Sequence, residues 1–297
     1  MGYQTPAAFR AALDARLNNA AQSGGRPVGR ARKLVAFSRL LARLEKHAAG
    51  QWVLKGGFAL ELRLADHARA TRDVDLDWAI SLEAATEAMI DAAALDLGDY
   101  FEFQVEQIGE VHEGFGRGVR FRADALVAGR LFEQLAIDLG FVDSLPHDPD
   151  ELDVPNLLDF AEIPGTRVPA APLEQHLAEK FHAYTRSYGD GHGSSRPKDL
   201  IDMVLISELA TFDAARLRET IGRVFEERGT HSVPINVPSP PMDWARRYRT
   251  LAQEVHIDPE PQAGHAQVAH MLNPLLGDEP AAERWVPATQ SWKTSDN

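Results

Sequence analysis

Hydrophobic positions in the first fifty residues recur at helical spacing. Residues 6–18 and 30–47 each carry apolar side chains three or four positions apart. The stretch AQSGGRPVG between them is rich in glycine and polar residues, which is typical of a loop. The pattern predicts a lead-in of two helices.

From residue 51 onward, strand-like and helical stretches alternate. WVL at 52–54 is a short apolar run that ends at two glycines, and residues 58–65 return to helical spacing. The stretch RDVDLDWAI at 72–80 alternates polar and apolar side chains, and Ser81 stands where a helix over 82–95 needs its N-cap. Two strands, each followed by a helix, are therefore expected here.

Three more strands are expected before residue 142. The stretches 101–111, 116–127 and 131–141 are rich in aromatic and β-branched residues, and the glycine-rich HEGFG joins the first pair as in an antiparallel hairpin. The first half, residues 1–165, is therefore predicted to be an α/β (α+β) domain with a mixed sheet and flanking helices.

Beyond a proline-rich stretch at 155–172 we expect helices only. The boundary is placed near residue 165, and residues 166–297 are predicted to form an all-helical domain. VPINVPSPP is expected to be a local linker or an extended wrap. The predicted helices cover residues 173–188, 198–209, 213–227, 242–255 and 264–275.

The composition constrains the compartment and the partners. The chain has 297 residues, a net charge of -13 and no cysteine. The charge argues against coating a polyanion, although a local basic groove can still bind nucleic acid. Without cysteine there is no disulfide, thiolate nucleophile or cysteine-ligated zinc. The opening residues are too charged for a signal peptide and no stretch is apolar enough to span a bilayer, so we expect a cytoplasmic protein without a membrane partner.

Three aspartates alternate along the predicted strand at 72–80. Asp73, Asp75 and Asp77 would share one face of the strand, with alternate residues roughly 7 Å apart. Two negative charges at that distance repel by about 0.6 kcal/mol in water and by about 2.4 kcal/mol at an effective dielectric constant of 20. The aspartates fit either a solvated face of an edge strand or a site for a divalent cation such as magnesium.

Lys55, Gly56 and Gly57 lie between a predicted strand and a predicted helix. Backbone N–H groups in such a turn can approach an anion, and the helix N-terminus adds positive potential. The chain has six lysines against twenty-five arginines, so a lysine directly before the glycines is a candidate to neutralise a phosphate. A simple tight turn is the alternative.

Asp138 interrupts an otherwise apolar run in the strand predicted at 131–141. A carboxylate in that position is paired, exposed at a strand end, or bound to a cation. We favour the cation, which adds a third candidate acid to the site.

These residues resemble a known family. The KGG stretch, the sequence R-x-T-x-D-x-D and a later strand acid are similar to the nucleotidyltransferase fold shared with DNA polymerase β, and specifically to AbiEii/MenT-type nucleotidyltransferase toxins. The second half resembles the family too, in EQHLAEKFHAYTRSYGDGHGSSRPKDLIDMVLI. The family commonly has Ser or Thr after the first glycine of its first motif, whereas Phe58 follows Gly57 here, so backbone N–H groups and Lys55 would have to hold the phosphates alone.

The resemblance implies transfer of a nucleoside monophosphate from an NTP to an acceptor hydroxyl. Asp73 and Asp75 would hold one or two magnesium ions, and Asp138 would bind the acceptor-side ion or take the acceptor proton. The catalytic set that the resemblance implies is Lys55, Asp73, Asp75, Asp138, Lys180 and Asp202. The nucleotide-binding set is Gly56, Gly57, Arg69, Thr71, Lys198 and Asp199.

The resemblance also assigns roles within these sets. Lys55 and Lys180 would neutralise the triphosphate, Arg69 and Thr71 would shape the loop that carries the acids, and Asp202 would orient Lys180 or the nucleotide. Simpler alternatives remain, because Asp199 and Asp202 near a helix start complement the helix dipole and Lys180 could be a surface lysine.

The acceptor implied by the resemblance is the 3′ end of tRNA, whose modification blocks aminoacylation and translation, and a cognate antitoxin is an implied partner. Two basic clusters could meet an RNA backbone or be solvated faces. The alternatives are transfer to a small molecule such as an aminoglycoside and a catalytically silent binding protein. The clusters are Arg26, Arg30, Arg32 and Lys33, and Arg246, Arg247 and Arg249.

Overall fold

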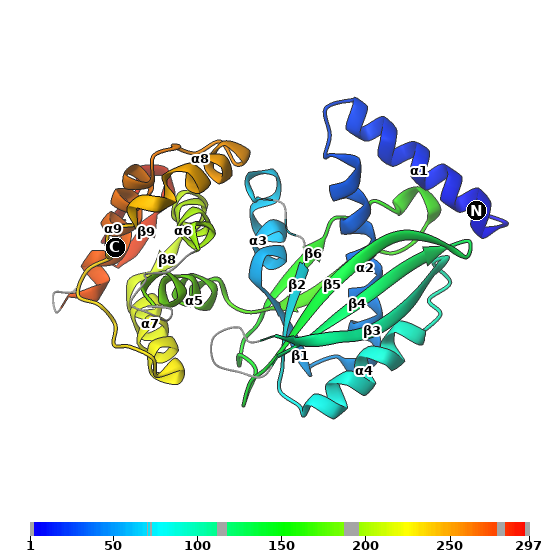
Figure 1. Ribbon diagram of the computed structural model, residues 1–297, viewed down its shortest axis with the longest axis horizontal. Coiled ribbons are helices and arrows are strands. Elements are labelled where there is room, and N and C mark those ends of the chain that lie inside the picture. The colour runs from blue at the N-terminus through cyan, green and yellow to red at the C-terminus, as the bar shows by residue number, and fades with distance from the viewer. Residues whose placement is uncertain are drawn as a thin grey trace. The chain divides into compact units, whose positions relative to one another are not determined.

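The computed structural model describes residues 3–69, 71, 73–111, 118–186, 196–277 and 283–294 (Figure 1). The chain forms two compact units. The first comprises residues 1–63 and 70–171, and the second comprises residues 64–69 and 172–297. The short segment 64–69 thus belongs to the second unit, although its neighbours in sequence belong to the first.

The helices and strands predicted up to residue 141 are confirmed. Ser81 caps its helix as predicted, because its Oγ accepts the backbone N–H of Ala84 at 3.2 Å. The helices of the first unit are α1 (Pro6–Gln22), α2 (Val28–Ala48), α3 (Gly56–Leu64) and α4 (Leu82–Ala94). Its strands are β1 (Trp52–Lys55), β2 (Asp73–Trp78), β3 (Phe101–Val111), β4 (Gly118–Val127), β5 (Arg130–Phe141), β6 (Asp150–Val154) and β7 (Thr166–Ala170).

The seven strands form one mixed sheet in the order β3-β4-β5-β2-β1-β7-β6 (Figure 1). β2 is parallel to β5 and antiparallel to β1, and β1 is parallel to β7. The helices α2 and α4 pack against each other and against strands of this sheet, and one set of alternating strand side chains joins them in the core, including Trp52, Leu76 and Ile137. The other set of alternating side chains points to the opposite face.

The buried Arg43 of α2 is fully hydrogen-bonded. Arg43 is 0% exposed and donates from Nη1 and Nη2 to the two carboxylate oxygens of Asp99, at 2.8 Å each. Its remaining N–H groups reach the carbonyl oxygens of Arg39, Leu95 and Phe101. A guanidinium has five N–H donors, so this arginine is satisfied and ties α2 to the start of β3.

Sequence analysis did not predict two strands of the first unit. β6 is the acidic stretch DELDV, and β7 contains Pro169, which has no N–H for a ladder and argues against a strand. β7 lies beyond the predicted boundary near residue 165, whereas the chain enters the second unit after Ala171. The predicted turn HEGFG lies outside the described residues.

The second unit is mainly helical, as expected, with α5 (Leu173–Thr185), α6 (Pro197–Leu209), α7 (Ala214–Arg228), α8 (Ala245–Glu254) and α9 (Pro261–Leu276). The expectation of helices alone needs correction, because β8 (Phe212–Asp213), β9 (Arg284–Val286) and β10 (Ser291–Lys293) form a three-stranded sheet. Strands of two or three residues are too short to show a period of two. VPINVPSPP contains no helix or strand, as predicted. None of the described helices is both long and apolar enough to cross a membrane.

Candidate active site

The predicted acids lie on the face of the sheet opposite the core. Val74 and Leu76 are buried in the core, so the aspartates that alternate with them in β2 point the other way. On β5, Asp138 alternates in the same manner with the buried Ile137 and Leu139. β2 is a central strand, and therefore these aspartates are not the solvated face of an edge strand.

Four charged residues form a row across β1, β2, β5 and β4. Lys55 pairs in register with Asp75, Asp75 pairs with Asp138, and Asp138 pairs with Arg120. Like charges directly opposite each other destabilise a sheet, and here a cation flanks the two carboxylates on each side. The register thus brings together two of the predicted metal ligands with Lys55 and with an arginine that sequence analysis did not select.

The cations of the row contact acids directly. Arg120 donates from Nε and Nη2 to the two oxygens of Asp138, at 2.6 and 2.5 Å, and its Nη2 lies 3.9 Å from Asp73. Lys55 Nζ lies 2.5 Å from Oδ1 of Asp77, whose side chain is 5% exposed. Lys55 is therefore paired with an acid outside the predicted set.

Position 56 requires a glycine, in part because Asp75 lies so close to it. Its φ is +67°, which favours glycine, and a Cβ built there would collide with the carboxylate of Asp75. Gly57 follows inside α3, which begins at Gly56. Gly140 makes similar room, since a Cβ there would meet Asp77 Oδ1 at 2.5 Å and Lys55 Nζ at 3.3 Å. These glycines let the charged side chains pack against the backbone.

Gly56→Ala is expected to destabilise the first unit more than Gly129→Ala. Both glycines have positive φ, but nothing lies within 4 Å of a Cβ at Gly129. The control therefore measures backbone strain alone, about 1–2 kcal/mol, whereas Gly56→Ala adds the collision with Asp75 and should cost about 2 kcal/mol more. Urea denaturation measures both losses, and equal losses would contradict the close approach of Gly56 and Asp75.

Thr71 holds the segment that leads into β2. Its Oγ1 donates to the carbonyl oxygen of Asp73 at 3.0 Å, and its backbone N–H donates to Oε2 of Glu61 at 3.4 Å. Arg30 Nε binds the other oxygen of Glu61 at 2.6 Å. A buried acid thus links the start of α2 to the loop before the aspartates.

The basic clusters are partly engaged within the protein. In the first, Arg30 binds Glu61, and Arg32 donates to Asp14 and to the carbonyl oxygen of Phe132. In the second, Arg249 binds Glu260 at 2.8 Å. These contacts give the arginines structural roles that do not require RNA.

A separate ion-pair network lies in the second unit. Lys180 Nζ lies 2.9 Å from Asp202 and 3.3 Å from Asp199, and both acids are 0% exposed. Arg69 donates from Nε and Nη2 to the two oxygens of Asp202, at 2.9 and 3.2 Å. Arg196 lies 3.2 Å from Asp199. Ion pairs through Lys180 and Asp202 therefore link four of the residues that the resemblance implies at the nucleotide, namely Arg69, Lys180, Asp199 and Asp202.

The charges of this network shift the pKa values of its members. Burial would lower the pKa of Lys180, but Asp202 and Asp199 raise it above its usual value. Burial would raise the pKa of Asp202, but Lys180 and Arg69 hold it below its usual range. The pKa of Lys198 is lowered, first by burial and then by Arg196 and Lys180. Burial is thus the main cause for Lys198, and the neighbouring cations Arg196 and Lys180 add to it.

The chemistry of the acids fits a magnesium ion, but their side chains are not assembled around one. Carboxylate oxygens are the ligands of hard cations, and Asp75 and Asp138 are neighbours on adjacent strands. Among the described residues, however, no group of three or more His, Cys, Asp or Glu side chains is arranged to hold a metal ion. Asp138 is instead occupied by Arg120.

Sequence analysis did not select Asp77, Arg120 or Gly140 for the site. Asp77 belongs to the alternating acids that drew attention to β2, so its face was predictable. Arg120 alternates with the buried Val119 and Phe121, which signals the polar face of β4 but not its neighbour on β5. No signal marks Gly140 before the Lys55–Asp77 pair is known.

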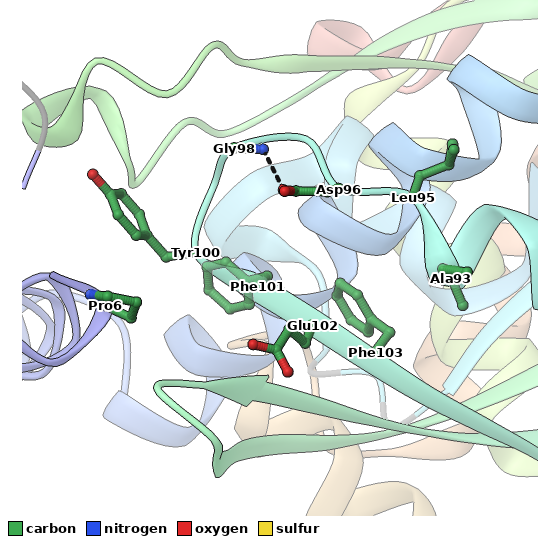
Figure 2. A pocket seen from close by; sticks show the side chains of 10 residues that line it. Pro6, Ala93, Leu95, Asp96, Gly98, Tyr100, Phe101, Glu102 and Phe103 are labelled. Carbon is green, nitrogen blue, oxygen red and sulfur yellow. Dashed lines mark hydrogen bonds between the residues drawn. The ribbon is translucent and has the colours of Figure 1, made fainter.

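A cavity of about 460 Å³ lies beside the first residues of β3, far along that strand from the residue that pairs with Arg120 (Figure 2). Phe101 at this end pairs with Val127, whereas Arg120 pairs with Gly109. Figure 2 shows the backbone N–H of Gly98 donating to Asp96 at its rim. The charged residues of its lining are the acids Asp96 and Glu102, so it does not suit a triphosphate.

Comparisons with known proteins agree with this architecture. The model of a family described as nucleotidyl transferase AbiEii toxin, type IV TA system, matches residues 39–292. No curated protein sequence matches the chain. The solved structure of MenT4, a nucleotidyltransferase toxin from Mycobacterium tuberculosis H37Rv, has a TM-score of 0.51 and 18% identity over 88% of this chain and 96% of that chain. This likeness supports the fold, and the predicted fold class is confirmed. A structure of a putative nucleotidyltransferase from H. pylori has a TM-score of 0.41 and 15% identity over 82% of this chain and 93% of that chain.

Proposed function

The chain belongs to the AbiEii nucleotidyl transferase toxin family, as its motifs predict, and from this premise we propose that it transfers a nucleoside monophosphate from an NTP to the 3′ end of tRNA and releases pyrophosphate. Such a transfer blocks aminoacylation and stops translation. The proposal includes a cognate antitoxin as partner and the cytoplasm, where tRNA is available, as the place of action.

The acids on β2 and β5 carry the chemical step in this proposal. Asp73 and Asp75 would hold one or two magnesium ions, and Asp138 would help to bind the acceptor-side ion or take the proton of the acceptor hydroxyl. A bound magnesium ion would offset the negative charge that develops on the transferred phosphate. Lys55, held by Asp77, adds positive charge beside Asp75.

The network of the second unit would bind the phosphates of the nucleotide. Lys180 and Lys198 supply positive charge. Asp202, which also binds Arg69, holds Lys180 in place. Asp199 anchors Lys180 and Arg196. Four cations, Arg69, Lys180, Arg196 and Lys198, accompany two buried acids, and this excess of positive charge favours an anionic ligand.

One observation carries the proposal. The register sets Lys55, Asp75, Asp138 and Arg120 in a single row on the polar face of the sheet. The chain that carries this row belongs to a nucleotidyltransferase family. A catalytically silent binding protein has no need for two carboxylates side by side on central strands, where they repel each other.

The test is incubation of the purified protein with magnesium, total tRNA and each α-labelled NTP in turn, followed by a denaturing gel. The proposal expects label on tRNA from a preferred NTP, and no label with Asp73→Ala. Release of pyrophosphate without labelled RNA would reject tRNA in favour of another acceptor, such as a small molecule. Neither label nor pyrophosphate with any NTP would reject the enzymatic proposal.

A further inference from the structure

Arg120 holds two of the acids proposed to bind metal. It is the partner of Asp138 across β4 and β5, and its guanidinium donates to both carboxylate oxygens of that residue. The same Nη2 lies 3.9 Å from Asp73. The Arg120 side chain is 41% exposed, while that of Asp138 is 10% exposed. A half-exposed arginine thus pairs with an acid that is almost buried.

This contact conflicts with a metal ion at the same carboxylate. A guanidinium that bonds side-on to both oxygens takes two of the roughly four lone-pair positions of the carboxylate, which leaves fewer for a divalent cation. The positive charge of Arg120 would also repel an ion held between Asp138 and Asp75. Arg120 and a metal ion on Asp138 therefore weaken each other's binding.

We propose that Arg120 neutralises Asp138 and Asp73 before nucleotide binds and turns to the triphosphate when nucleotide arrives. This inference rests on the proposed function. A planar guanidinium matches a phosphate as well as a carboxylate, and a half-exposed side chain is able to change partners. Release of Asp138 by the triphosphate then makes binding of the divalent cation and of the nucleotide mutually favourable.

The other cations nearby are not suited to this role. Lys55 is held by Asp77, a buried acid outside the predicted metal set, and both pack against Gly140. Arg122, two residues from Arg120 and on the same face, binds Glu106, whose side chain is 62% exposed. Arg122 is 44% exposed, which matches Arg120, so it is a control for the loss of one positive charge on this face.

The experiment is titration of Mn²⁺ into protein without nucleotide, with free Mn²⁺ followed by electron paramagnetic resonance. Arg120→Gln should bind Mn²⁺ about tenfold more tightly than the wild type, since a coupling of this kind is typically 5- to 150-fold. Arg122→Gln should bind as the wild type does. Arg120→Lys keeps the charge but loses the side-on fork, and its affinity should fall between those of the wild type and Arg120→Gln.

The outcomes separate this inference from the function on which it rests. Equal Mn²⁺ affinity in the wild type and Arg120→Gln, with binding lost in Asp75→Asn, would overturn the role of Arg120 and leave the metal site standing. An equal gain in Mn²⁺ affinity in Arg122→Gln would mean that the loss of any positive charge on this face has the same effect. That result would also overturn the role of Arg120. Absence of Mn²⁺ binding in every variant would overturn the metal site itself.

Discussion

Asp75→Asn is expected to lower the rate of nucleotidyl transfer about a thousandfold or more, which corresponds to about 4 kcal/mol of transition-state stabilisation. Asp75 lies in the middle of the charged row, between Lys55 and Asp138. Asparagine has almost the same shape, so it should still pack against Gly56, but it cannot supply the negative charge that a metal ion needs. Initial rates of label transfer measure the effect.

Asp124→Asn is the matched control for this experiment. Asp124 also lies on the sheet, in β4, where it accepts a hydrogen bond from Gln134 at 2.9 Å. It is no part of the charged row, and its replacement should leave the rate unchanged. The two variants and the wild type should unfold at similar urea concentrations. A rate for Asp75→Asn within tenfold of the wild type would remove Asp75 from the mechanism.

The face of each candidate acid could be predicted from the sequence, but its partner could not. A period of two places Asp73, Asp75 and Asp77 opposite Val74 and Leu76, whatever the rest of the fold does. The pairing of Asp75 with Asp138 depends on β2 and β5 being parallel neighbours, although α4, β3 and β4 separate them along the chain. Long-range register of this kind has no local signal in one sequence.

The same limit explains the assignments around Lys55. Lysine is scarce in this chain, and the place of Lys55 before two glycines indicated a phosphate ligand. In the structure, Lys55 forms an ion pair with Asp77, which lies opposite Val53 in the neighbouring strand. Gly56 was predicted as a backbone anion site, and its positive φ and contact with Asp75 supply a structural reason for glycine as well. Gly56 can serve as an anion site and also make room for Asp75, and only a measurement of activity separates the two roles.

The helical half was predictable in its helices, because they are long and periodic. Its strands are two or three residues long and were missed, and β7 was missed because Pro169 argued against it. Lys180 and Asp202 were selected by resemblance alone. Their burial and their contacts with Arg69 and Asp199 depend on packing that no pattern in the sequence reveals.

Asp202→Ala is expected to reduce the stability of the second unit by about 3–5 kcal/mol. Asp202 is 0% exposed and is the shared partner of Arg69 and Lys180. Its removal leaves Lys180 with Asp199 alone and leaves Arg69 without the carboxylate that it forks. Urea denaturation followed by circular dichroism measures the loss. Asp243→Ala, at an exposed acid of the same unit, should change the stability by less than about 0.5 kcal/mol.

The pH dependence of stability tests whether the effect arises from charge. The pKa of Asp202 in the folded protein is held below its unfolded value of 3.8, against the effect of burial, by Lys180 and Arg69. The folded state therefore binds fewer protons than the unfolded state as the pH falls below about 4, so the stabilisation is complete above that pH and is lost progressively below it. Asp202→Asn, which cannot titrate, should lose stability at pH 7 and show a shallower decline in acid. An acid decline as steep as that of the wild type would mean that Asp202 does not hold this network together by its charge.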